Sequence, residues 1–129
     1  MALASVLLVD NDIAALASAR AVLSVAGYAV HEVFGGRRAL QRVMASPPTL
    51  LMTEILMPDG DGIELITEVK RWHPHIRVIA VAKRRFLSKL DLLDVASKLG
   101  ADATLDKPLK PGILLATVAD LIRLEARSA

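Results

Sequence analysis

Cysteine is absent from this 129-residue sequence, and aromatic residues make up only 3% of it. Without cysteine, the chain can form neither disulfides nor thiolate metal sites, which indicates a reducing setting. Because aromatic rings are scarce, the 53% hydrophobic content has to come from Val, Leu, Ile and Ala, which suits helices packed on buried strands. The first apolar run ends at Asp10 and is too short for a signal peptide or a membrane span. We therefore expect a soluble, cytoplasmic protein without membrane contact.

A strong charge of either sign is also lacking. Sixteen Lys and Arg stand against fourteen Asp and Glu, so the formal net charge is +2. Seven of the basic residues fall between residues 70 and 89, which we interpret as a solvated edge. A mild excess of this size does not argue for nucleic acid. We expect no direct nucleic-acid binding by this chain.

Short apolar runs alternate with helix-like stretches along the whole sequence. Several of the runs are continuously apolar, which is typical of strands buried on both faces of a parallel sheet. The expected strands are 5–9, 28–33, 49–53, 77–82 and 101–105. The expected helices are 12–26, 36–45, 61–71, 86–99 and 110–126, with Asp12 and Asp61 as N-caps and Gly100 after the fourth helix. The pattern predicts repeated βαβ units in one α/β domain, residues 1–129, with a core of about 4–126.

Ligands of open α/β sheets bind beyond the carboxyl ends of the strands. We therefore expect the residues that follow the strands to meet at one edge of the sheet. They are Asp10, Asn11 and Asp12 after the first strand, Glu54 after the third, Ala82 and Lys83 after the fourth, and Asp106, Lys107 and Pro108 after the fifth. Acidic and basic groups are thus predicted to lie together.

This constellation resembles the receiver domain of bacterial two-component response regulators over essentially the whole chain. The motifs that carry the resemblance are VLLVDND, AGYAVHEV, TEILMPDGDG, RVIAVAK and GADATLDKP. It implies a flavodoxin-like (βα)5 three-layer sandwich, with a five-stranded parallel sheet in the order 2-1-3-4-5. It also implies a role in phosphorelay signal transduction rather than an enzyme, with a histidine kinase or a downstream signalling protein as partner.

The resemblance further implies roles for individual residues. In such receivers an aspartate after the third strand accepts a phosphoryl group, two acids after the first strand hold Mg²⁺, and a lysine after the fifth pairs with the phosphate. Here Asp10, Lys107 and Pro108 follow the pattern. Glu54 stands at the phosphoacceptor position, and Asn11 replaces the second acid in the group Asp10, Asn11 and Asp12. We expect Lys107 to reach the Glu54 carboxylate and the Lys107–Pro108 bond to be cis.

The positions that report phosphorylation in ordinary receivers also differ. Ala82 stands where a hydroxyl is usual, and Thr104 stands where an aromatic ring is usual. If Lys83 pointed inward, it and Lys107 would balance Asp10 and Glu54. Since one carboxylate is missing, we expect Mg²⁺ to be absent or weakly bound. We interpret the chain as a phosphorylation-independent protein-interaction module with a degenerate phosphorylation site.

Several alternatives stay open at this point. One is a receiver that still responds to phosphate, and another is that Glu54 mimics a phosphoaspartate. A third is a flavin-binding protein on the same fold, although the first loop, DNDIAA, is not the Ser/Thr/Gly-rich loop that a flavin phosphate would need. A homodimer is conceivable through an apolar side of helix 12–26 or through the fourth helix, fifth strand and fifth helix.

Overall fold

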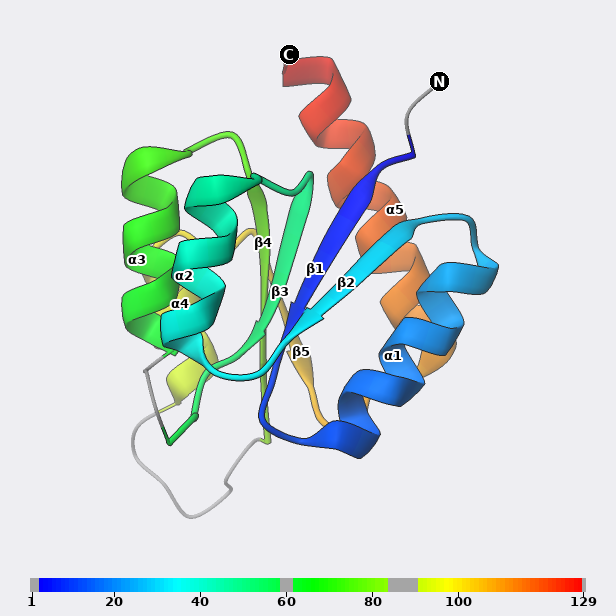
Figure 1. The fold of residues 1–129 in the computed structure, drawn as a ribbon, viewed down its shortest axis with the longest axis horizontal. Coiled ribbons are helices and arrows are strands. Elements are labelled where there is room, and N and C mark those ends of the chain that lie inside the picture. Colours follow the sequence, from blue (N-terminus) through cyan, green and yellow to red (C-terminus); the bar gives the residue numbers. More distant parts are fainter. Residues whose placement is uncertain (1–2, 59–61, 84–90, 129) are drawn as a thin grey trace.

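The structure is a computed structural model, and it describes residues 3–58, 62–83 and 91–128. Strands and helices alternate along these ranges (Figure 1). The strands are β1 (Ser5–Val9), β2 (Ala29–Val33), β3 (Leu50–Glu54), β4 (Arg77–Ala82) and β5 (Ala103–Asp106). The helices are α1 (Ile13–Val25), α2 (Gly36–Ala45), α3 (Gly62–Trp72), α4 (Leu92–Lys98) and α5 (Pro111–Ser128).

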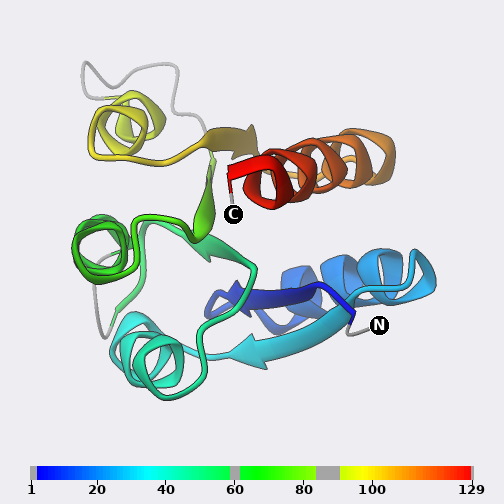
Figure 2. The same cartoon turned by 90° about the horizontal axis from the view of Figure 1, so that it is seen from above.

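The five strands form one parallel sheet in the order β2-β1-β3-β4-β5. Helices α2, α3 and α4 cover one face, and α1 and α5 cover the other, so that Figure 2 shows three layers. This arrangement confirms the predicted fold class and strand order.

The sheet is buried because successive side chains of each inner strand enter opposite helical layers. Leu7 and Leu51 belong to the core cluster beneath α2, α3 and α4. Leu8 and Met52, one residue further along, belong to the cluster beneath α1 and α5. Continuous apolar runs in the sequence therefore correspond to strands with a core on each side.

Element boundaries differ from the predictions in a few places. The third strand includes Glu54, and the fifth runs over Ala103–Asp106 rather than 101–105. Residue 101 belongs instead to the turn after α4, since the Ala101 amide donates to the Ala96 carbonyl. Gly100, at the end of this helix, has a φ of 119°, which favours glycine.

Helix α4 begins at Leu92, with Asp91 as an N-cap that accepts from the Leu93 and Asp94 amides. The predicted start at residue 86 and the predicted cap Asp61 lie outside the described residues. In the part of the chain that the structure covers, no helix has both the length and the apolar character needed to cross a membrane.

Candidate functional site

The strands place three charged side chains at one end of the sheet and on one face of it. Leu8, Met52 and Leu105 are all buried in the core beneath α1 and α5. Because side chains alternate along a strand, the residue two positions after each of these faces the same layer. Those residues are Asp10, Glu54 and Lys107. We call them the carboxylate pocket.

Lys107 joins the other two members of the carboxylate pocket. Its Nζ lies 2.7 Å from Asp10 Oδ2 and 3.0 Å from Glu54 Oε2. The side chains are only 16%, 9% and 9% exposed for Lys107, Asp10 and Glu54 respectively. The predicted ion pair between Lys107 and Glu54 and the predicted cis bond between Lys107 and Pro108 are both confirmed. The shorter contact, from Lys107 to Asp10, was not predicted.

The second oxygen of Asp10 serves the turn that follows β1. Asp10 Oδ1 accepts the backbone N–H of Asn11 at 2.8 Å and that of Asp12 at 3.0 Å. Both carboxylate oxygens of Asp10 therefore have a donor or a cation. Asn11 itself is exposed and contributes its backbone amide to this turn.

Asp12 begins α1. Its Oδ1 accepts the N–H groups of Ala14 and Ala15 at 3.0 and 3.2 Å, as the predicted N-cap should. These contacts are those of a helix cap rather than of a group facing Lys107. Asp10, Asn11 and Asp12 thus form a turn. Of these three residues, only Asp10 contacts Lys107 in the described part of the chain.

Burial is the main influence on the pKa of Glu54. Desolvation raises its pKa above the ordinary value of 4.5, the nearby Asp10 also raises it, and Lys107 lowers it only in part. Within the described part of the chain, Glu54 Oε2 has the Lys107 ion pair but no well-aligned hydrogen-bond donor. The ion pair therefore compensates the buried carboxylate incompletely.

The pKa of Lys107 is shifted in the direction that keeps it charged. Burial alone would lower this pKa, but contact with the Asp10 and Glu54 carboxylates more than offsets the burial and raises it above the ordinary 10.5. Lys107 is therefore a permanent cation at neutral pH.

The backbone around Glu54 is tightly held. The hydroxyl of Thr53 donates to the Glu54 carbonyl at 2.8 Å, and the Gly62 amide donates to the Ile55 carbonyl at 2.8 Å. A Cβ on Gly62 would lie 2.3 Å from the Glu54 carbonyl oxygen and 2.7 Å from Ile55 Cα. Gly62 is therefore required for α3 to begin directly against the end of β3.

Ala82 and Thr104 lie on the opposite face of the sheet from the carboxylate pocket. Ala82 is buried in the core beneath α2, α3 and α4, and its carbonyl accepts the Lys107 amide at 3.1 Å. Thr104 is half-buried and alternates with Leu105, so it faces the α4 side. In the register of β4 and β5, Thr104 pairs with Ala80, two residues before Ala82 on the same strand.

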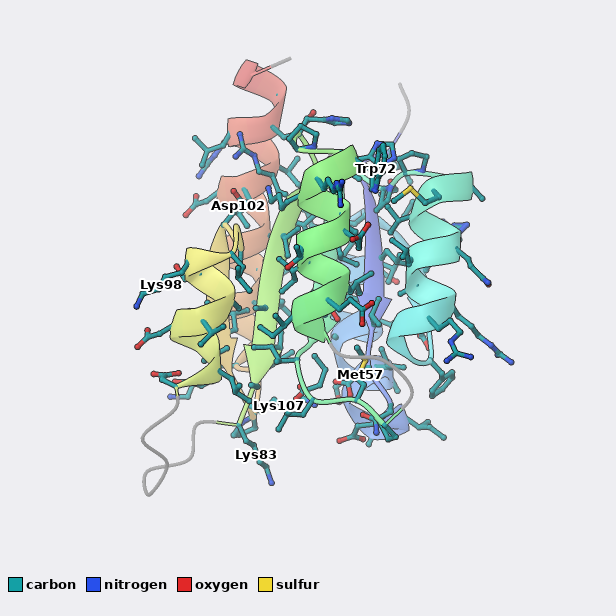
Figure 3. The ribbon with its side chains drawn as sticks, turned by 90° about the vertical axis from the view of Figure 1, so that its left-hand side faces the viewer. Met57, Trp72, Lys83, Lys98, Asp102 and Lys107 are labelled. Carbon is teal, nitrogen blue, oxygen red and sulfur yellow. The ribbon has the colours of Figure 1, made fainter. Side chains whose placement is uncertain are left out.

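The prediction that Lys83 could point inward, and with Lys107 balance the charges of Asp10 and Glu54, is wrong. The residue is exposed, and its side chain extends outward beyond the end of the sheet (Figure 3). The physical reason is its place just after the last residue of β4, where the chain leaves the sheet. Asp10 and Glu54 therefore share the single charge of Lys107, and the pocket keeps a formal charge of −1 when Glu54 is ionised.

A second charged cluster, at the opposite end of β4 and β5, was not predicted. Asp102 Oδ2 lies 2.7 Å from Lys70 Nζ and accepts the Val78 amide at 2.8 Å, and Asp102 Oδ1 lies 3.3 Å from Arg77 Nη1. Figure 3 shows Asp102 well above Lys107, toward the other end of the sheet. The only signal in the sequence was a carboxylate placed directly after a helix-ending Gly-Ala turn.

Comparison with known proteins agrees with this geometry. A family model described as the response regulator receiver domain matches residues 6–119. The response regulator MprA of Mycolicibacterium vanbaalenii is 31% identical over 119 residues, and the KDP operon transcriptional regulatory protein KdpE of Escherichia coli is 30% identical over 119 residues. Both alignments cover 92% of this chain, but only 50% and 51% of the relatives. The chain thus spans about half the length of the curated relatives it matches.

Solved structures show the same fold. A CheY-like response regulator receiver domain from Methanospirillum hungatei has a TM-score of 0.90 and 27% identity, with 99% of this chain and 100% of that chain covered. A response regulator structure from Chloroflexus aurantiacus has a TM-score of 0.87 and 25% identity, with 95% of this chain and 99% of that chain covered. With the family model matching most of its length, this chain belongs to the response regulator receiver domain family.

Proposed function

We propose that this receiver domain is a phosphorylation-independent protein-interaction module in two-component signalling. The observation that carries the proposal is the pair of contacts from Lys107 to Asp10 and Glu54. In the family, the lysine after the fifth strand pairs with a phosphate that arrives at the acceptor. Here Lys107 is already paired with the two carboxylates that surround it.

Glu54 is poorly suited to accept a phosphoryl group. It is one methylene longer than the aspartate of ordinary receivers, roughly 1.5 Å of extra chain. Misplacement of a reacting group by about 1 Å can lower a positioned reaction ~100-fold. Its Oε2 is also buried and in contact with Lys107. These features favour a structural ion pair over a nucleophile.

The oxygen donors that a divalent cation would need are largely committed. Mg²⁺ requires about six oxygen ligands in near-octahedral geometry. Asp10 Oδ1 serves the turn amides, Asp10 Oδ2 contacts Lys107, and Asn11 offers no carboxylate. An ammonium between the two carboxylates also repels a second cation. The residues of this pocket therefore do not fit Mg²⁺ well, and we assign the pocket no metal-dependent step.

The positions that would transmit phosphorylation lack the necessary groups. Ala82 has no hydroxyl to bind phosphoryl oxygens, and Thr104 has no ring to change its position. A ligand shifts a conformational equilibrium only by its differential affinity for the two states. Phosphate at Glu54 would therefore bias a second conformation little. We propose that the partner, a histidine kinase or a downstream signalling protein, recognises one constant surface.

The test is treatment of the protein with a small acyl-phosphate donor and Mg²⁺, followed by intact-mass measurement. We expect no gain of a phosphoryl group. The double variant Glu54→Asp with Asn11→Asp serves as a positive control, since it restores the second acid and shortens the acceptor side chain. We expect that variant, unlike its parent, to bind Mg²⁺ in a calorimetric titration. A phosphoryl gain in the parent that is lost in Glu54→Gln would overturn the proposal and favour a phosphate-responsive receiver.

A further inference from the structure

Strand β2 forms one edge of the sheet, because among the described strands it pairs with β1 alone. The Ala29 amide and the Val33 carbonyl, at the two ends of β2, both bond with residues that flank β1. Backbone groups alternate in direction along a strand, so the N–H and C=O groups of Val30 and Glu32 point away from the sheet. Within the described chain, this leaves an edge that can accept a further strand.

The two faces beside this edge differ in charge. Val30 belongs to the core beneath α1 and α5, so Glu32, two residues later, lies on that face. There its carboxylate is paired with Arg20 at 3.2 Å. His31 alternates with these residues and lies on the α2 face. Figure 2 shows β2 at the edge of the sheet, with α2 and α1 in the layers on either side. Because the Glu32 charge is paired, the α2 face decides which charge an added strand should carry.

Helix α2 gives its face an uncompensated positive charge. It carries three arginines and no acidic residue, and no Asp or Glu occurs between residues 33 and 53. Arg38 is exposed and Arg42 is half-buried. Neither forms an ion pair with a carboxylate in the part of the chain that the structure covers.

The acidic groups of neighbouring elements lie away from this edge. Glu64 and Glu68 belong to α3, which lies on the side of α2 that faces away from β2 (Figure 2). The carboxylates of Asp10 and Glu54 face the layer of α1 and α5, on the other side of the sheet, and are paired with Lys107. An anion beside β2 on the α2 face therefore meets arginines without competing carboxylates among the described residues.

A cavity of about 50 Å³ lies at this edge, beside the last turns of α2. Its polar lining consists of Arg42, His31 and two serines, and none of its described lining residues is acidic. A water needs roughly 10–15 Å³ of such space. The cavity therefore has room for a carboxylate group next to Arg42.

The spacing of the arginines matches an extended chain. Arg38 and Arg42 are four residues apart, which is about 6 Å along a helix. Side chains on one face of a strand recur about every 6.6 Å. We propose that the β2 edge binds an extended acidic segment of a partner protein as an added strand, with carboxylates at alternate residues facing Arg38 and Arg42. This rests on the proposed function only in taking the partner to be a protein, and it does not depend on whether Glu54 accepts a phosphoryl group.

Other occupants fit this edge less well. Antiparallel pairing of β2 with the β2 of a second copy would place the two α2 helices on the same side of the joined sheet. The uncompensated arginines of the two copies would then repel one another. A nucleic acid cannot continue the hydrogen-bond ladder of β2, and tight duplex binding uses about 6–10 phosphate contacts, more than two arginines supply.

The probe is the peptide Ac-TVEVEVT-NH₂, titrated into the ¹⁵N-labelled protein and followed by amide chemical shifts. We expect saturable shifts at Val30, Glu32 and Arg38. The Val30 and Glu32 amides should also exchange more slowly with solvent, because they gain acceptors in the added strand. Ac-TVQVQVT-NH₂ lacks the charges, and we expect it to bind roughly fivefold to tenfold more weakly, in the range of two exposed ion pairs. Ac-TVVEEVT-NH₂ has the same composition with adjacent glutamates, which face opposite sides of a strand, and we expect binding of intermediate strength.

Matched double variants locate the site. Arg38→Gln with Arg42→Gln should weaken Ac-TVEVEVT-NH₂ roughly fivefold to tenfold and change the binding of Ac-TVQVQVT-NH₂ less than about twofold. Arg71→Gln with Lys98→Gln removes the same charge from exposed positions of α3 and α4. We expect this control to change the binding of either peptide less than about twofold.

Other outcomes would overturn the proposal. Absence of peptide-dependent shifts at about 1 mM would remove the site. Equal binding of the three peptides, or shifts without slower exchange at Val30 and Glu32, would contradict an added acidic strand. Shifts of the β2 amides on protein dilution without peptide would assign the edge to a second copy, and tighter binding of a single-stranded oligonucleotide would assign it to nucleic acid. Circular dichroism shows whether each variant keeps the fold, and the titrations of the unmutated protein do not depend on the variants. A phosphoryl gain at Glu54 would overturn the proposed function and leave these titrations as they are.

Discussion

Replacement of Lys107 by methionine would test whether the carboxylate pocket depends on a single cation. Methionine keeps most of the aliphatic stem of lysine, so the main change is the loss of charge. It leaves Asp10 and Glu54 facing each other, with side chains only 9% exposed in each case. Asp10 keeps the Asn11 and Asp12 amides, whereas Glu54 Oε2 loses the one cation it contacts among the described residues.

The expected cost follows from this geometry. Removal of one partner from a buried ion pair costs about 3–5 kcal/mol. Because part of Lys107 is exposed and Glu54 can take up a proton, we expect the lower end, about 3 kcal/mol of unfolding free energy near neutral pH. Two carboxylates that share a site raise one another's pKa, so protonation of Glu54 should reduce the cost. The penalty of Lys107→Met should therefore shrink as the pH falls through the raised pKa of Glu54.

A second variant separates charge from packing. In the double variant Lys107→Met with Glu54→Gln, Glu54 no longer carries a charge, and Asp10 remains with the Asn11 and Asp12 amides on its Oδ1. Loss of both partners is far less costly than loss of one, so we expect the double variant to recover about 1–2 kcal/mol. Together with the effect of Glu54→Gln alone, this recovery gives the coupling between the two side chains.

The assay is urea unfolding followed by far-UV circular dichroism at several pH values, with Lys98→Met as the exposed-lysine control. Surface substitutions usually change stability by less than about 0.5 kcal/mol. If Lys107→Met were as small in effect as Lys98→Met, or if its effect did not vary with pH, the described ion pairs would not be what stabilises the pocket. For Lys107 itself, the raised pKa means that its contribution is complete below the ordinary 10.5 and is lost as the pH rises through the folded-state value.

Three further predictions use the same unfolding assay. Gly62→Ala should lower the free energy of unfolding by about 2 kcal/mol or more, because its Cβ would meet the Glu54 backbone. Gly112→Ala, whose Cβ would have nothing within 4 Å, should instead raise it by roughly 0.5–1 kcal/mol. Equal effects would contradict the close approach of α3 to β3. Below the ordinary carboxyl pKa of 4.5, Glu54→Gln should be as stable as the parent. As the pH rises through the raised folded-state pKa, the parent ionises a buried group, so the variant should become the more stable of the two. If the variant were instead less stable above that pKa, the ion pair would outweigh desolvation. Asp102→Ala should lower the free energy of unfolding by roughly 2 kcal/mol, since it removes two ion pairs and the acceptor of a backbone amide. Asp120→Ala removes an exposed ion pair on α5 and should lower it by at most about 0.5 kcal/mol. Similar losses would mean that the Asp102 cluster stabilises the fold little.

The alternation of strands and helices was predictable because it depends on periodicity, whereas the strand order was predicted from the family resemblance. Buried parallel strands read as continuous apolar runs, and their ends mark the edge where charged residues meet. The contact between Lys107 and Glu54 followed from the family resemblance, and the same alternation explains it, since both residues come two positions after a buried residue of one core.

The features that were missed depend on side-chain direction and on turns. Lys83 follows the strand directly, and only its position in three dimensions shows that it leaves the sheet outward. The contact of Lys107 with Asp10 requires the strand order as well as the side of the sheet, because a long side chain has to reach across β4 and β3. The Asp102 cluster joins a helix, a strand and a turn, and no local pattern brings these together.

The positions of Asp102 and Lys107 also bear on how the edge of the sheet opens. Strand β5 has four residues and, among the described strands, pairs with β4 alone, so its own ladder would allow it to fray. Asp102 precedes the strand and is ion-paired to α3 and β4, and Lys107 follows it and is ion-paired to the ends of β1 and β3. Detachment of β5 therefore requires both attachments to break. Its amides should exchange with solvent through a larger, more cooperative opening than those of a free edge strand, and the strand is poorly disposed to swap between two molecules.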